Sequence, residues 1–134
     1  MSEKEKTAIL KNAFKHYNEN KAQLRSLSYE GLRAVDYTKE RTGKRTATGD
    51  EQKIVRYLDQ KRTLENHIKI VERVMWFYRL TGGGKYEYIV ARWVKGMKCY
   101  RAAMECYITE HTAYNWGKEI MQTAARAADL FNLW

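Results

Sequence analysis

The chain has 134 residues, enough for one compact domain or for a small domain with a helical extension. It contains no proline, so the residue that most often breaks helices is missing. The net charge of +9 indicates a polyanionic partner, with nucleic acid ahead of a membrane surface. No apolar run approaches the roughly 20 residues of a membrane span. Because residues 1–6 also lack an apolar signal region, a cytoplasmic protein is expected.

The first part of the chain is predicted to be a helical segment over residues 1–35, followed by a linker. Apolar residues recur at roughly helical spacing from 4 to 33, and because Asn18 and Asn20 weaken the middle, the segment is either one helix or two shorter ones. Residues 36–49 are polar and basic without an apolar period, which is typical of a flexible linker. Its basic side chains, which either contact a DNA backbone or are simply solvated, are Lys39, Arg41, Lys44 and Arg45.

Residues 50–81 have the clearest periodicity and are predicted to form one long amphipathic helix. Asp50 and Glu51 suit its start, where the helix dipole favours negative charge. A helix this long cannot bury its whole apolar stripe against a small domain. A homodimer through the 50–81 helix is therefore favoured slightly over packing against the N-terminal helix. The stripe, interrupted at Lys61, consists of Ile54, Leu58, Leu64, Ile68, Val71, Met75 and Tyr78.

Three glycines, residues 82–84, are predicted to end this helix as a cap and hinge. With Lys85 they resemble a phosphate-binding loop only superficially. The required glycine five places earlier is missing, and Tyr86 follows the lysine where that loop needs Ser or Thr. A domain over residues 85–134 then begins with a short amphipathic helix that ends near Gly96.

The stretch from Tyr100 to Trp116 has the pattern of a helix-turn-helix. Such a motif needs a small residue where its helices touch, an apolar residue in the turn and a polar N-cap on the second helix. Ala103, Ile108 and Thr109 meet these needs in that order. By spacing, the second helix is predicted to bury Ala113, Trp116, Ile120 and Ala124. The fold expected for the chain is all-α, a long helix plus a C-terminal helix-turn-helix domain.

The opposite face of that second helix is predicted to read double-stranded DNA, because the first turns of a recognition helix meet base edges in the major groove. Asn115 can pair bidentately with adenine, and Glu110 can accept from a cytosine amino group or repel wrong sequences. The candidate base-reading residues are Glu110, His111, Thr112, Tyr114 and Asn115. The candidate phosphate contacts are Lys95, Lys98, Arg101, Thr109 and Lys118.

The residues from Ala102 to Trp116 resemble the terminal helix-turn-helix of the RinA and ArpU families of phage transcription regulators. That motif is itself similar to the promoter-reading fourth region of sigma factors. The family phrase IA..L..S..T.YRW is matched by Ala102 and Ala103, by Thr109 in place of the serine, and by Thr112 to Trp116. The resemblance implies control of late genes in a phage of Gram-positive bacteria, contact with RNA polymerase, and a location in the cytoplasm of the bacterial host cell.

Two residues depart from the family pattern. Tyr107 stands where these turns usually carry glycine, which predicts a distorted or lengthened turn. Asn115 replaces the usual basic residue, which predicts a weaker phosphate contact and a shifted sequence preference.

Three other functions compete with DNA-binding regulation. An enzyme is not expected, since the three histidines fall in separate segments, and neither a cofactor nor a metal is predicted. Cys99 and Cys106, on one helical face, are interpreted as two buried thiols. A small terminase subunit also joins a helix-turn-helix to helical oligomerisation segments, but it typically forms rings, whereas a regulator is expected to be a monomer or dimer. A phage protein that inhibits a host protein would need no DNA.

Overall fold

The computed structural model describes residues 2–27 and 47–134, without the side chains of 47–50, and every regular element in this part is a helix. The predicted all-α fold is thus confirmed. The elements are α1 (Glu3–Lys15), a helical stretch over 17–27, α3 (Ala47–Thr81), α4 (Lys85–Ile89), η1 (Val90–Val94), α5 (Cys99–Glu105) and α6 (Glu110–Phe131). No helix in the described ranges combines the length and apolarity needed to cross a bilayer. Most of the predicted linker lies outside the described residues.

α1 begins at a capping box, in which the Ser2 hydroxyl accepts from the Glu5 amide and the Glu5 carboxylate accepts from the Ser2 amide. The helix ends at Lys15, with His16 as its C-cap, ahead of the two asparagines predicted to weaken it, and the chain resumes as helix at Tyr17. The turn is stabilised by tertiary contacts of the residues that follow it. The Tyr17 hydroxyl lies 3.5 Å from a Glu72 carboxylate oxygen, and the Asn18 amide donates to the Val94 carbonyl at 2.7 Å.

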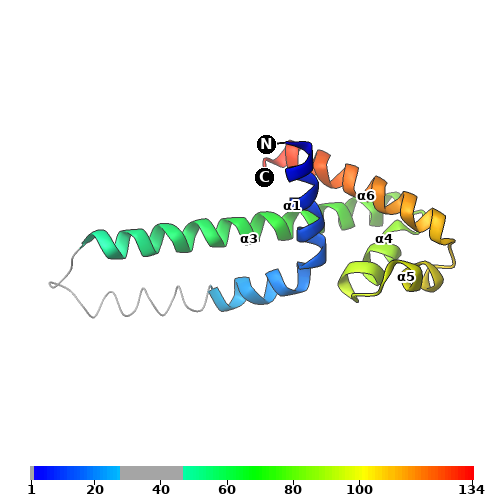
Figure 1. Ribbon diagram of the computed structural model, residues 1–134, viewed down its shortest axis with the longest axis horizontal. Coiled ribbons are helices and arrows are strands. Elements are labelled where there is room, and N and C mark those ends of the chain that lie inside the picture. Colours follow the sequence, from blue (N-terminus) through cyan, green and yellow to red (C-terminus); the bar gives the residue numbers. More distant parts are fainter. Residues whose placement is uncertain (1, 28–46) are drawn as a thin grey trace.

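α3 is the long central helix, and Figure 1 shows its N-terminal end extending beyond the other described helices. It begins at Ala47, inside the predicted linker. Gly49 does not prevent this, because one glycine costs a helix only about 1 kcal/mol. The predicted stripe is buried only in its second half. Leu64 and Ile68 are buried, whereas Ile54 and Leu58 remain 52% and 53% exposed.

α6 packs against the C-terminal half of α3 in the opposite direction (Figure 1). The Tyr78 hydroxyl lies 2.7 Å from the Thr123 hydroxyl, and near the other end of α6 the Arg73 guanidinium lies 4.6 Å from the Phe131 ring centroid. α1 crosses this pair, and Lys6 of α1 forms a partly exposed ion pair of 3.9 Å with Asp129 near the end of α6.

α4, η1 and α5 close the end of the α3–α6 pair. The predicted short helix after the glycines is present, but its second half is a π-helix, in which the Lys95 amide donates to the Val90 carbonyl at 2.8 Å. Gly84, with φ +89°, lies so close to the Trp116 ring that an added Cβ would be 3.3 Å from it. The Lys85 ammonium pairs with the Glu119 carboxylate at 2.8 Å and so connects α4 to α6.

Candidate nucleic-acid interface

α5 and α6 pack against each other through small side chains. Ala102 and Ala103 of α5 and Ala113 of α6 are completely or almost completely buried, which lets the two helices approach closely. Residues 106–109 join them, within the roughly three to four residues expected for a helix-turn-helix turn. The two helices and the short turn are therefore present, and their use as a DNA-reading motif stays a prediction.

The turn, which Tyr107 predicts to be distorted or lengthened, keeps its ordinary length. Tyr107 itself takes the left-handed conformation, with φ +57°. Its amide donates to the Met104 carbonyl at 3.2 Å, and the Ile108 amide donates to the Ala103 carbonyl at 2.9 Å. These two bonds form the Schellman motif, which usually has glycine at the left-handed position. Tyrosine therefore keeps the ordinary turn at the cost of local backbone strain, and its side chain is 97% exposed.

Replacing Tyr107 with glycine is expected to raise the free energy of unfolding by up to about 1 kcal/mol. The left-handed conformation costs a non-glycine residue about 1–2 kcal/mol. Removing this strain stabilises the folded state, but glycine also loses more conformational entropy on folding, which offsets about 0.5–1 kcal/mol of the gain. Urea unfolding followed by circular dichroism measures the change. Tyr107→Phe is the control and should leave stability unchanged, and a glycine variant less stable than wild type would contradict the strain argument.

α6 has one buried face and one exposed polar face over its first turns. Ala113, Ile120 and Ala124 are buried, as predicted. Trp116 is only half-buried and packs against the core. The exposed face carries five of the predicted DNA contacts, Glu110, His111, Tyr114, Asn115 and Lys118.

Two pairs of side chains on this face contact each other one helical turn apart. The Asn115 amide nitrogen lies 3.3 Å from the His111 Nε2, and the Lys118 ammonium lies 4.5 Å from the centroid of the Tyr114 ring. Pairs at this spacing stabilise a helix by about 0.2–0.5 kcal/mol each. The polar groups of this face thus lie next to one another along one side of α6.

Thr109 and Thr112 have a structural task in addition to any contact with DNA. The Thr109 hydroxyl accepts from the Thr112 amide at 3.1 Å, which makes Thr109 the N-cap of α6, as predicted. It also donates to the Thr112 hydroxyl at 2.9 Å. Because Thr112 is half-buried as well, it is less available to a base edge than the four exposed candidates.

The predicted phosphate-contacting cations are exposed but are not all in one place. Lys95, Lys98 and Arg101 lie on the segment from the end of η1 into α5. Arg101 borders a shallow hollow of about 310 Å³ together with Met104, Glu105 and Tyr107. Lys118 lies instead beside a larger groove of about 790 Å³ between α1, η1 and α6.

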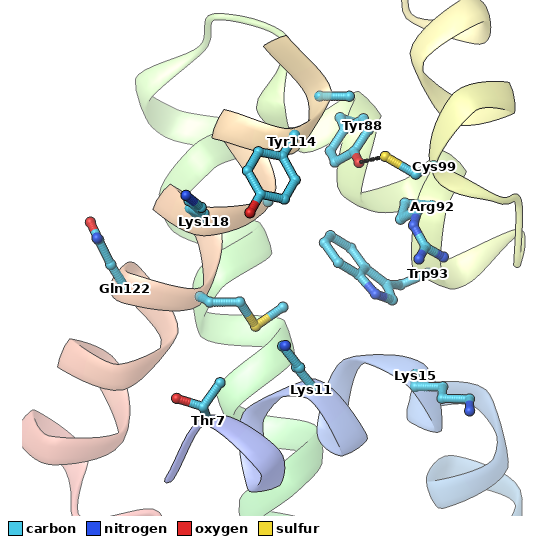
Figure 2. Close-up of a pocket in the computed structure, with 13 residues that line it drawn as sticks. Thr7, Lys11, Lys15, Tyr88, Arg92, Trp93, Cys99, Tyr114, Lys118 and Gln122 are labelled. Carbon is cyan, nitrogen blue, oxygen red and sulfur yellow. Dashed lines mark hydrogen bonds between the residues drawn. The ribbon is translucent and has the colours of Figure 1, made fainter. Parts of the chain in front are cut away.

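That groove contains basic residues that the sequence interpretation did not select. Lys11 and Lys15 reach it from α1, and Arg92 reaches it from η1 (Figure 2). In the sequence these residues are ordinary charged positions of amphipathic helices. More than 75 residues separate the two lysines on α1 from Arg92 on η1. Only the packing of α1 across the C-terminal helices brings them beside Lys118.

The cysteines and histidines do not assemble into a reactive group in residues 2–27 and 51–134. Cys99 and Cys106 are free and half-buried rather than fully buried as predicted. The Cys99 thiol lies 3.5 Å from the Tyr88 hydroxyl. Burial, together with Glu105 and Glu87, raises the pKa of the Cys106 thiol, which lowers its thiolate fraction and its reactivity. No group of metal-ligating side chains was found in this part of the chain.

Comparisons with models of known protein families, with curated protein sequences and with solved structures gave no match. The resemblance to the RinA and ArpU regulators therefore stays a prediction.

Proposed function

We propose that this chain is a sequence-specific, double-stranded DNA-binding transcription regulator that reads bases with the first turns of α6. The observation that carries this proposal is the exposed polar face from Glu110 to Lys118 on a helix whose other face is buried. The helix is N-capped by Thr109 and follows α5 through a four-residue turn, as a recognition helix does. The net charge of +9 supplies the attraction to phosphate.

The roles of individual residues follow from their chemistry. Asn115 offers both a donor and an acceptor to an adenine edge, and Glu110, His111 and Tyr114 offer further hydrogen bonds to bases. Lys95, Lys98 and Arg101 contact phosphates and set the register of the protein on the duplex. Late-gene control in a phage, contact with RNA polymerase and action in the bacterial cytoplasm complete the proposal, on the strength of the resemblance alone.

The exposed apolar residues at the start of α3 support a homodimer as part of the same proposal. Ile54 and Leu58 lie on the part of the helix that extends away from the core (Figure 1). Pairing this stripe with a second copy would bury it in a coiled coil. A symmetric dimer would then bind a palindromic site with two half-sites.

The test is a selection of bound duplexes from a random library at near-physiological salt, followed by affinity measurements on the selected site at several salt concentrations. We expect an enriched motif, and a palindromic motif if the protein binds as a dimer. Lys98→Ala/Arg101→Ala should weaken binding to all sequences and lower the slope of log affinity against log salt by about one unit per lost contact. The Arg62→Ala/Lys69→Ala variant removes two exposed cations of α3 and should change neither quantity.

Other outcomes would replace this proposal with a different one. Binding without an enriched motif, together with a ring-shaped oligomer in solution, would favour a small terminase subunit. No salt-sensitive binding to any duplex would overturn DNA binding and favour a protein that inhibits a host protein.

A further inference from the structure

A groove of about 790 Å³ opens between α1, η1, the start of α5 and the first half of α6. Figure 2 shows the lining residues Lys11 and Lys15 on α1, Arg92 and Trp93 on η1, and Tyr114 and Lys118 on α6. Its inner surface is largely aromatic and apolar. The Trp93 ring packs on buried Phe14 at 5.0 Å and edge-on to Tyr88 at 5.9 Å between ring centroids.

The groove is lined by four basic side chains and by no acidic one. The ion pairs that the described residues form among themselves are Lys6–Asp129, His16–Glu19 and Lys85–Glu119, and none involves the four cations. Arg92 is held by a hydrogen bond to the Met97 carbonyl at 3.0 Å, which fixes its position without neutralising its charge. Four positive charges around one opening repel one another and favour an anionic occupant.

The position of the cations favours an extended anion at the rim over a small molecule enclosed in the groove. Lys11, Lys15 and Lys118 are exposed, whereas the half-buried residues Arg92 and Trp93 form the wall. Lys11 and Lys15 lie one turn apart, about 6 Å along the axis of α1. They therefore present a row of charge parallel to the helix rather than a single converging site.

The groove also shares residues with the face of α6 that we propose to read bases. Tyr114 and Lys118 belong to both. A duplex with its major groove on the first turns of α6 would thus have one strand beside the groove. Arg101 of α5, and Lys98 just before this helix, would contact the duplex without any part of α1.

We propose that the rim formed by Lys11, Lys15, Arg92 and Lys118 binds the sugar-phosphate backbone of the duplex that α6 reads, so that α1 is part of the DNA interface. This inference rests on the proposed function, since it needs a duplex on α6. It assigns the N-terminal helix a direct contact with DNA, beyond its packing against the core.

The first experiment compares wild type, Lys11→Ala/Lys15→Ala and the Arg62→Ala/Lys69→Ala control on the selected duplex over a range of salt. Alanine is the best helix former and both lysines are exposed, so α1 should stay folded, which circular dichroism checks. Each lost phosphate contact lowers the slope of log affinity against log salt by about 0.9. We expect a fall of about two units for the α1 variant, an unchanged preference among sequences, and no change for the control.

The second experiment locates the contacts with methylphosphonate linkages, which remove the charge of one phosphate at a time. In wild type, neutralising a phosphate near Lys11 or Lys15 should weaken binding. In the α1 variant the same substitution should have little further effect, because its protein partner is already absent. In the Lys98→Ala/Arg101→Ala variant, the phosphates whose neutralisation has little further effect should differ from those of the α1 variant.

The outcomes separate this inference from the proposed function. If wild type selects a motif but the α1 variant matches the Arg62→Ala/Lys69→Ala control in slope and in phosphate dependence, α1 is not part of the interface although the chain still reads DNA. If wild type binds no duplex, the proposed function fails and the inference fails with it.

Discussion

Replacing Phe14 with alanine is expected to lower the free energy of unfolding by about 3–5 kcal/mol. Phe14 is 0% exposed, and its ring lies 5.0 Å from that of Trp93 on η1. Removing it would leave a cavity where α1 meets the C-terminal helices. The same contact sets the position of Lys11 and Lys15, so DNA affinity should fall together with stability. Urea unfolding followed by circular dichroism measures the first effect.

Phe131→Ala is the matched control, since it removes the same atoms from a partly exposed site. The Phe131 ring is 46% exposed and has the Arg73 guanidinium 4.6 Å from its centroid. Losing that cation–π contact costs about 0.5–1 kcal/mol at an exposed position, and the partial burial of the ring adds about 1 kcal/mol, so the loss should stay below that of Phe14→Ala. Equal losses for the two variants would show that α1 is not packed on the core as described.

The helices of the C-terminal half could be predicted because their sequence carries both a period and terminal residues. α6 shows this best. Thr109 is the predicted cap, and Ala113, Ile120 and Ala124 are buried as the helical spacing predicts. Local sequence decides these features, because a cap and an apolar face belong to the helix itself.

The long helix shows where the same reasoning fails. Its apolar stripe predicts which face is apolar, but not how far the neighbouring helices extend along it. Ile70 and Val74, which are outside the predicted stripe, are completely buried, while Ile54 and Leu58 are exposed. Burial on α3 is decided by where α1 and α6 cross it, and these crossings involve residues far apart in sequence.

The π-helix and the groove could not be predicted for a related reason. η1 is stabilised by tertiary contacts, with Trp93 between the rings of Phe14 and Tyr88. Lys11 and Lys15 follow an ordinary pattern of exposed lysines on an amphipathic helix. Their place beside Arg92 and Lys118 appears only when α1 is packed beside η1 and α6. The exposed polar face of α6 lies within one helix and could be predicted from sequence, whereas the basic rim of the groove is assembled from three elements.

The largest functional effect is expected for Tyr114→Ala/Asn115→Ala, which should remove most of the discrimination between the selected site and other duplexes. Each specific base contact is worth about 1–3 kcal/mol, so the double variant should lose about 2–6 kcal/mol of discrimination if the two contacts are independent. Its affinity for unrelated DNA should change little, because phosphate contacts dominate nonspecific binding. Fluorescence anisotropy with the selected duplex and a scrambled duplex measures both quantities.

Single variants separate hydrogen bonding from the shape of this face. Tyr114→Phe keeps the ring over which the Lys118 ammonium lies at 4.5 Å and removes only the hydroxyl, so a loss of discrimination would assign a hydrogen bond to that group. Asn115→Ala also frees His111 from its contact at 3.3 Å. His111→Ala must therefore be measured beside it, and a base-reading role for Asn115 requires that its effect be confined to one base pair. Equal weakening on selected and scrambled duplexes by the Tyr114→Ala/Asn115→Ala variant would instead make this face a phosphate-binding surface without sequence preference.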